Sequence, residues 1–176
     1  TPNFFMGAMD NGGPYGAPQD ALTLWKFTAD FTTPANSTFV LANTIPIASY
    51  DTIFPCTPTS RNCIPQPGTA NKIDILSYRQ RPTHRLAYRN FGGHEAMVTN
   101  QSVEARPGIA GVRWYEVRRV DGEYTVFQQG TYAPEDGVHR WMGSAAMDRD
   151  GNMAIGYSVV NGVDVFPGIR YTGRFA

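Results

Sequence analysis

Short apolar runs alternate with glycine-containing turns along the chain, and this pattern predicts strands. The run Trp141–Met147 is followed by the polar stretch Asp148–Asn152 and then by a second apolar run, Met153–Val160. The Asp-Gly step in the polar stretch supplies the positive-φ residues that a tight hairpin turn requires. Runs of this length, bounded by turn residues, are typical of antiparallel strands. The chain is therefore expected to be all-β.

The same pattern places the expected strands in three groups. Asp121-Gly122, between the last two strands of the second group, is again a hairpin signal. The expected strands are Phe4–Ala8, Ala21–Phe27 and Thr38–Ile47 in the first group; Arg85–Phe91, Ala96–Val103, Val112–Arg119 and Tyr124–Tyr132 in the second; and Trp141–Met147, Met153–Val160 and Ile169–Thr172 in the third.

The second and third groups also share an ordered set of motifs. Self-similarity at a fixed separation, here about 56 residues, predicts a repeat architecture. A fainter copy stands near the N-terminus, where Phe4–Gly7 is followed by Asp20–Phe27. In the clearer pair, the motifs His84-Arg85, Ser102-Val103 and Gly111-Val112-Arg113-Trp114 recur as His139-Arg140, Ser158-Val159 and Gly168-Ile169-Arg170-Tyr171.

Four antiparallel strands per repeat of about 55 residues predict the blade of a β-propeller. The single segment 1–176 then holds roughly two and a half four-stranded blades, with blade-like repeats at approximately 1–50, 73–134 and 138–176 and an insertion loop at 51–72. Because a propeller needs at least four blades, we expect the remaining blades to come from the same gene product or from companion chains. A β-sandwich is the alternative, since it accommodates the strands without requiring a repeat.

Composition and charge narrow the range of possible binding partners. The chain has 15 Lys and Arg and 15 Asp and Glu, and neither sign forms a run, so the basic footprint of a nucleic-acid-binding protein is missing. No window approaches the ~20 apolar residues of a membrane span. We therefore expect no nucleic-acid partner and no membrane span, and the possible ligand is a glycan or a protein.

The two cysteines, Cys56 and Cys63, lie in the Pro- and Thr-rich stretch Pro55–Pro67. This stretch has too few apolar residues to become ordered by burial, and a disulfide across so short a loop stabilises by about 2–3 kcal/mol. We expect a Cys56–Cys63 disulfide, with two free thiols as the alternative. A disulfide implies an oxidising compartment, so the protein is expected to be secreted, extracellular or periplasmic.

The run Ala146–Ser158 resembles the strand–Asp-x-Asp-Gly-Asn–strand unit of sialidase-like and other bacterial extracellular propellers. The wider run His84–Arg174 is similar to a segment of large secreted bacterial proteins of unassigned function, some of which carry sialidase-like labels. The resemblance implies a secreted β-propeller. The Asp-box Ser-x-Asp-x-Gly-x-x-Trp of sialidases is not matched, because no Trp follows the Asp-Gly turn.

Candidate ligand-binding residues come from the repeated Arg-aromatic pairs. Arg113 and Arg170 would converge if they lay on adjacent blades, and arginines bind a substrate carboxylate through bidentate hydrogen bonds. Trp114 and Tyr171, which follow them, complete the expected ligand-binding set. The alternative is architectural, with each arginine capping a strand end or stacking on an aromatic ring.

Catalytic residues are not assignable from the sequence. A glycosidase needs two carboxylates in a defined geometry, and the available ones, Asp10, Asp20, Glu95, Glu116 and Asp164, lie in no recognisable motif. Asp148, Asp150 and Asn152 have the alternating spacing of a calcium loop, but the later Glu is absent, so a hairpin turn closed by these side chains is expected instead. Neither a metal nor a cofactor is expected.

Two functional classes follow. The first is a non-catalytic extracellular propeller segment that serves as a scaffold or as a binding surface for glycan or protein, and it is favoured because architecture accounts for each distinctive residue. The second is a part of a carbohydrate-active, sialidase-like glycoside hydrolase whose catalytic groups lie partly outside this chain.

Overall fold

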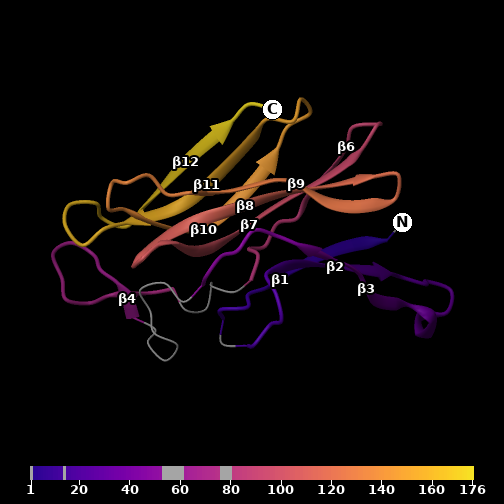
Figure 1. Cartoon of the computed structure of the whole chain (residues 1–176), viewed down its shortest axis with the longest axis horizontal. Helices are drawn as coiled ribbons and strands as arrows, with labels where there is room; N and C mark the ends of the chain where they lie inside the picture. Colours follow the sequence, from indigo (N-terminus) through magenta and orange to yellow (C-terminus); the bar gives the residue numbers. More distant parts are fainter. Residues whose placement is uncertain (1, 14, 53–61, 76–80) are drawn as a thin grey trace.

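The computed structural model describes residues 2–13, 15–52, 62–75 and 81–176, and the regular structure there is β-strand apart from the short 3-10 turn η1 (Pro34–Asn36) (Figure 1). The expected all-β fold is confirmed. No helix within these ranges is long and apolar enough to cross a membrane. The strands are β1 (Asn3–Met9), β2 (Ala21–Thr28), β3 (Thr38–Pro46), β4 (Asn62–Ile64), β5 (Ile73–Asp74), β6 (Ala87–Asn90), β7 (Glu95–Arg106), β8 (Ile109–Val120), β9 (Glu123–Tyr132), β10 (His139–Met147), β11 (Met153–Val160) and β12 (Gly168–Arg174).

Within each sheet, strands pair with their neighbours in the sequence, so the chain forms antiparallel meanders. β1–β3 make the first sheet, β6–β9 the middle sheet and β10–β12 the third sheet, while β4 and β5 form a two-stranded ribbon. Every strand expected from the sequence is present. β7 and β8 are longer than expected, because the turn at Gly108 (φ 76°) keeps Glu104 and Arg106 paired with the start of β8.

Both Asp-Gly turns are hairpins, as expected. Asp121 and Gly122 have φ angles of 49° and 93°, as a type I′ turn requires. Between β10 and β11 side chains close the turn: Asp148 Oδ1 accepts hydrogen bonds from the backbone N–H groups of Asp150 and Asn152, each at 2.9 Å, and Asn152 Nδ2 donates to Asp148 Oδ2 at 2.8 Å. Both carboxylate oxygens of Asp148 are thus engaged within the turn, and Asn152 Oδ1 accepts a hydrogen bond from the Ala176 N–H at 3.1 Å.

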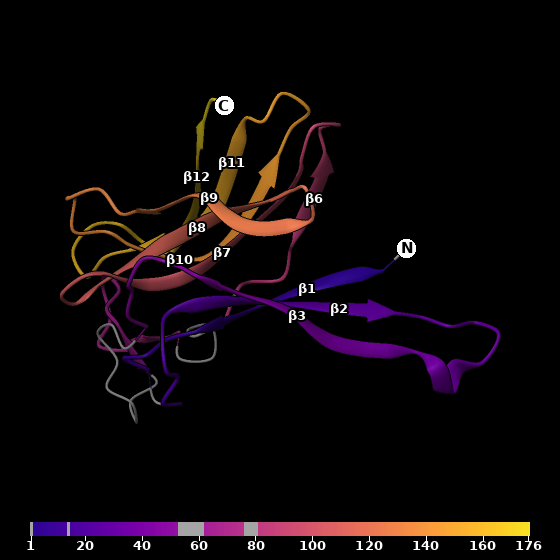
Figure 2. The same ribbon diagram turned by 45° about the vertical axis from the view of Figure 1, so that its right-hand side comes forward.

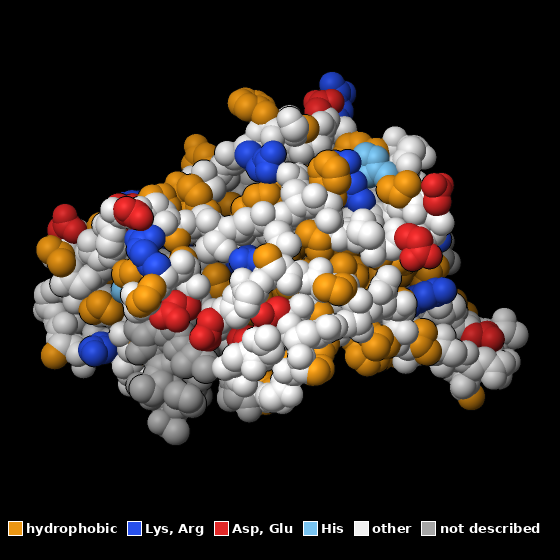
Figure 3. Space-filling view, in the orientation of Figure 1, with side chains coloured by type: hydrophobic (Ala, Val, Ile, Leu, Met, Phe, Trp, Pro, Cys, Tyr) orange, Lys and Arg blue, Asp and Glu red, His pale blue; other side chains and the backbone are white. Residues whose placement is uncertain are grey.

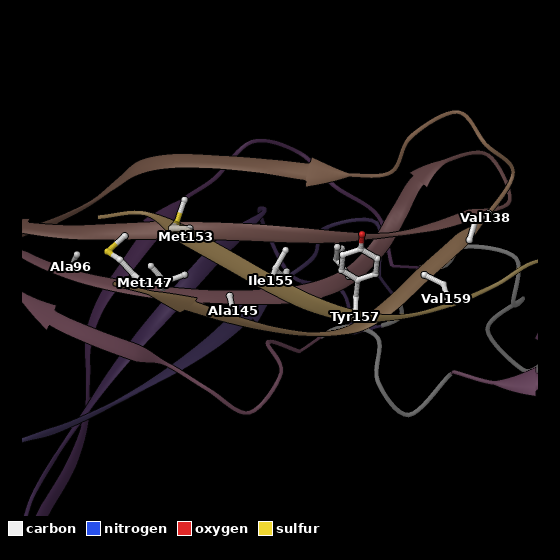
Figure 4. Close-up of a cluster of buried hydrophobic side chains, with 10 residues drawn as sticks. Ala96, Val138, Ala145, Met147, Met153, Ile155, Tyr157 and Val159 are labelled. Atoms are coloured by element: carbon white, nitrogen blue, oxygen red, sulfur yellow. The ribbon is translucent and has the colours of Figure 1, made fainter. Parts of the chain in front are cut away.

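The middle sheet is covered on both faces. On one face Ala96 and Val98 lie in a cluster with side chains of the third sheet, among them Ile155 and Tyr157 (Figure 4). On the other face a second cluster joins the middle sheet to the first, with Met97, Tyr115 and Val117 on one side and Leu22, Leu24 and Ile45 on the other. Figure 2 shows the first sheet (indigo) and the third (yellow) on opposite sides of the middle sheet.

Burial on both faces explains the composition of β7. All positions from Ala96 to Val103 are buried, so the strand is a continuous run of apolar and uncharged polar residues. A strand covered on both faces has no solvent side and needs no alternation of polar and apolar residues. β10 has one covered face, and from Trp141 to Met147 its residues alternate between buried and exposed.

The pairing register is the same in the middle and third sheets for two of the repeated motifs. Ser102 lies opposite Val112, and Ser158 lies opposite Ile169. The next pairs along the strands, Gln101 with Arg113 and Tyr157 with Arg170, match as well. The Ser-Val and Gly-(Val/Ile)-Arg motifs therefore stand at equivalent places in two neighbouring sheets.

The two His-Arg pairs do not share a position. His139 begins β10, lies opposite Val160 and is buried. His84 is exposed and precedes β6, and its neighbour Thr83 donates a backbone hydrogen bond to the Asn100 carbonyl at 2.8 Å. The sequence expectation of one repeat position was wrong here, because a matching dipeptide does not fix strand register.

Cys63 is buried in β4, in a cluster with Ile64, Ile75 and Trp141. Its expected partner, Cys56, lies outside the described residues, so the disulfide between them stays a prediction.

Candidate functional site

The four side chains expected to bind ligand do not form one site. Arg113, on β8, faces the first sheet and is buried, whereas Arg170, on β12, is exposed. Trp114 faces the third sheet, where it lines a small cavity of about 170 Å³. The guanidinium of Arg174 lies 5.4 Å from the centroid of the Trp114 ring. Tyr171 lies on the outer face of the third sheet and is 85% exposed.

Arg113 is held by groups of the protein. Its Nη2 donates to the Ala48 carbonyl at 2.9 Å and to Gln129 Oε1 at 2.8 Å. Its guanidinium carbon lies 5.7 Å and 5.6 Å from the ring centroids of Tyr50 and Tyr115. With 8% of its surface exposed, Arg113 fixes the connector that follows β3 against the middle sheet. These contacts correspond to the architectural alternative for this residue.

The interface between the middle and third sheets contains a comparable arginine, but it is Arg140 rather than Arg170. Arg140 is 2% exposed, and its guanidinium lies 5.5 Å from the Tyr132 ring and 6.0 Å from the Tyr157 ring. Its Nη2 forms an ion pair with Asp136 Oδ2 at 2.6 Å. Each sheet interface thus buries an arginine between two tyrosine rings.

Two buried carboxylates lie beside the Arg113 cluster and are engaged in hydrogen bonds. Asp10 Oδ2 accepts from the hydroxyl and the backbone N–H of Thr52 at 2.5 Å and 3.1 Å. Asp20 accepts from Asn11 N–H at 3.0 Å and from the Ser49 hydroxyl at 2.8 Å. Because both carboxylates already accept hydrogen bonds from the protein, this cluster is suited to holding in place the connector that follows β3.

The tyrosines of this cluster stay neutral near pH 7. Burial raises the pKa of Tyr50 to about 12, and the nearby charges of Asp10 and Asp20 act in the same direction, against the hydrogen bond from Gln101 and the charge of Arg113. Burial likewise raises the pKa of Tyr115. A tyrosine whose pKa is raised is a poor nucleophile at neutral pH.

A larger hollow lies between the first and middle sheets, beyond the Arg113 cluster along β7 and β8. Its volume is about 510 Å³, which lies in the range typical of small-molecule sites. We call it the inter-sheet groove, and the side chains that line it include Phe4, Lys26, Tyr88, Glu95, Arg119 and Tyr124.

The groove is built from two facing cross-strand rows. On the first sheet, Phe4 of β1 lies opposite Lys26 of β2. On the middle sheet, Glu95 of β7 lies opposite Arg119 of β8, which lies opposite Tyr124 of β9. Directly opposed residues in antiparallel sheets project from the same face, so each row presents its side chains together. The edge-to-face contact of Phe4 and Tyr124, with ring centroids 5.9 Å apart, joins the two walls.

The middle-sheet row consists of two adjacent charged residues, Glu95 and Arg119, followed by the aromatic Tyr124. Arg119 Nη1 lies 3.0 Å from Glu95 Oε1, and the Arg119 guanidinium lies 5.6 Å from the Tyr124 ring centroid. Burial raises the pKa of Tyr124. The positive charge of Arg119 lowers this pKa and the negative charge of Glu95 raises it further, and because the net shift is upward the hydroxyl stays protonated at neutral pH. Lys26 forms no hydrogen bond or ion pair with any described residue.

Sequence reasoning missed the groove because no motif contains it. Its residues come from strands of two sheets, between β1 and β9 in the chain. Glu95 was considered only as an unassigned carboxylate. One signal for the groove was available in the sequence, namely the register of the β7–β8 hairpin. Because β7 and β8 are joined at Gly108, Glu95 lies opposite Arg119 at the end of the hairpin away from the turn.

The histidines do not meet. His139 Nδ1 accepts from the Ala110 N–H at 3.3 Å, and burial lowers its pKa, so it is a neutral hydrogen-bonding partner. His94 stacks on Phe91 with ring centroids 4.9 Å apart. Across the described part of the chain, no group of three His, Cys, Asp or Glu side chains is placed to hold a metal ion.

The chain matches no known protein family, no curated protein and no solved structure.

Proposed function

We propose that this chain is a sector of an extracellular β-propeller and that it serves as a non-catalytic scaffold, with the inter-sheet groove as its glycan-binding site. Further sheets, from the same gene product or from companion chains, would complete the ring. The inter-sheet groove is the observation that carries the binding role.

The stacking of the sheets supports the propeller part of the proposal. The layers follow chain order, each is a meander, and the middle layer is covered on both faces. A two-sheet sandwich has one core between two inner faces, whereas propeller sheets pack face to face in succession. The equal register of Ser102 and Ser158 against their partner strands is what successive blades would require.

The outer faces of the stack support the need for neighbouring sheets. On the first sheet, Trp25 stacks on Phe39 with ring centroids 5.2 Å apart, and Phe5 contacts Phe39 edge to face. Phe39 is 56% exposed. Apolar side chains gathered on one sheet face mark a surface that a partner covers.

The state of the carboxylates supports binding rather than hydrolysis. Within the described ranges, Glu95 is the only carboxylate that lines the groove, and a glycosidase needs two on either side of the bond that breaks. Asp10 and Asp20 are buried and accept hydrogen bonds from neighbouring groups of the protein.

The lining of the groove supports a sugar as the ligand. Tyr88 and Tyr124 offer aromatic surface for the C–H face of a pyranose ring, and they carry hydroxyls at their edge. Glu95 and Arg119 supply acceptors and donors for ring hydroxyls. On the face in Figure 3, acidic and basic side chains are interspersed.

The proposal is tested by an oligosaccharide array probed with the complete assembly that contains this chain, together with the variant Tyr88→Ala. Tyr88 is 53% exposed, so its removal should leave the fold intact and weaken binding about fivefold through lost ring stacking. Tyr15→Ala, at an 81% exposed position away from the groove, is the matched control. Absence of binding to any glycan contradicts the proposal. Release of reducing sugar from a bound glycan supports the glycoside hydrolase instead.

A further inference from the structure

We infer that the glycan bound in the inter-sheet groove is acidic, with its carboxylate or sulfate group held between Lys26 and Arg119. This inference rests on the proposed function and assigns the class of ligand at the same site.

Charge in the groove favours an anion. Two cations, Lys26 and Arg119, line it against one carboxylate, Glu95, so the groove carries an excess positive charge in a chain whose net charge is zero. Near protein surfaces, two opposite charges within a few ångströms attract each other more strongly than they do in bulk water.

The donors of the groove are incompletely used. Among the described residues Lys26 has no partner for its ammonium group. Arg119 gives one guanidinium nitrogen, Nη1, to Glu95, and its buried Nε has no hydrogen-bond partner. A guanidinium with free N–H groups and a neighbouring ammonium form the donor set that carboxylate and sulfate oxygens accept.

The placement of these donors suits a sugar acid rather than a free anion. Lys26 stands on the wall formed by the first sheet and Arg119 on the wall formed by the middle sheet, with Tyr88 and Tyr124 on the same side as Arg119. A pyranose ring against Tyr124, whose ring centroid lies 5.6 Å from the Arg119 guanidinium, would project an acidic substituent toward the cations. A small inorganic anion would use the cations and leave the aromatic surface bare.

The test compares three probes by calorimetry on the complete assembly that contains this chain: an oligosaccharide with terminal glucuronate, its neutral glucose counterpart and a sulfated counterpart of equal length. The glucuronate and sulfate probes should bind at least about tenfold more tightly than the neutral one, and their affinity should fall as NaCl rises from about 0.05 to 0.5 M. The tighter of the two acidic probes identifies the anionic group.

Two variants with opposite expected signs sharpen the test. Lys26→Gln should weaken the acidic probe about tenfold and leave the neutral one unchanged, while Glu95→Gln should strengthen the acidic probe by about twofold to fivefold. Lys72→Gln, at the other lysine of the chain and outside the groove, is the control. Equal affinity for acidic and neutral probes with no effect of Lys26→Gln overturns this inference and leaves glycan binding standing. Binding of none of the three probes overturns this inference, whereas glycan binding itself is overturned only if the oligosaccharide array also shows no binding.

Discussion

Tyr171 on β12 holds the register position in the third sheet that Trp114 on β8 holds in the middle sheet. Trp114 lies opposite Asn100, and Tyr171 lies opposite Gly156, at equal distances along strands that match residue for residue. The third sheet covers Trp114, whereas Tyr171 is 85% exposed. The outer face of the third sheet therefore lacks the layer that its counterpart in the middle sheet has.

The first prediction concerns these outer faces. Studied by itself, the chain 1–176 should self-associate or pack loosely, since about 400 Å² of uncovered apolar surface corresponds to roughly 10 kcal/mol of lost burial. Replacing Tyr171 and Phe39 by Ser should shift the chain toward monomer in sedimentation experiments. Tyr15→Ser should not. A monodisperse wild-type monomer with a sharp two-state melt would instead favour a closed β-sandwich.

The second prediction concerns the ion pair of Arg140 with Asp136. Arg140 is almost fully buried and Asp136 is 40% exposed at its side chain. Asp136→Asn removes the countercharge from a buried guanidinium, and it should lower the free energy of unfolding by about 1–3 kcal/mol, less than for a fully buried pair because water screens the carboxylate. Denaturant titration measures this, with Glu123→Gln as the exposed control. An unchanged stability would show that solvent already compensates Arg140.

The same pair predicts a pH dependence. The hydrogen bond from Arg140 holds the pKa of Asp136 down at about 2, with the Val138 N–H and the charge of Arg140 adding to it. A carboxyl whose pKa is lower in the folded chain contributes stability above its unfolded pKa of about 3.9, and this is lost as pH falls toward about 2. Stability measured between pH 5 and pH 2 should fall less steeply in Asp136→Asn than in the wild type. Equal slopes would contradict the assignment.

The third prediction is that the turn after β10 needs no metal. Asp148 accepts hydrogen bonds from Asp150 and Asn152, and these donors lower the pKa of its carboxyl, so it is ionised and satisfied within the turn. EDTA should leave the melting temperature unchanged, whereas Asp148→Ala should lower it by a few degrees. A calcium-dependent rise of several degrees in differential scanning calorimetry would show that the turn is a metal site.

The fourth prediction is the Cys56–Cys63 disulfide, which lies partly outside the described residues. Mass spectrometry without reduction should find the peptide that contains both cysteines two hydrogens lighter than the dithiol. Reduction should then cost about 2–3 kcal/mol of stability, as expected for a short loop. Two thiols that alkylate in native protein would rule the bond out.

The sequence by itself determined the strands, the hairpins and part of the repeat, because these depend on neighbours in the chain. Asp121-Gly122 sets a type I′ turn through its own φ angles, and the turn then fixes which residues of β8 and β9 pair. The Ser-Val motifs at Ser102 and Ser158 also take the same register against their partner strands, although β8 has 12 residues and β12 has 7.

Only the tertiary structure decided what those residues do. Arg113 and Arg170 have equivalent registers, yet Arg113 is buried between two tyrosine rings, whereas Arg170 is exposed although its cross-strand partner Tyr157 is buried, so register alone does not set burial. The inter-sheet groove depends on long-range packing. Lys26 and Arg119 line the same groove only because the first sheet packs on the middle sheet. Local sequence patterns do not predict that contact between sheets, so the groove could be identified only from the tertiary structure.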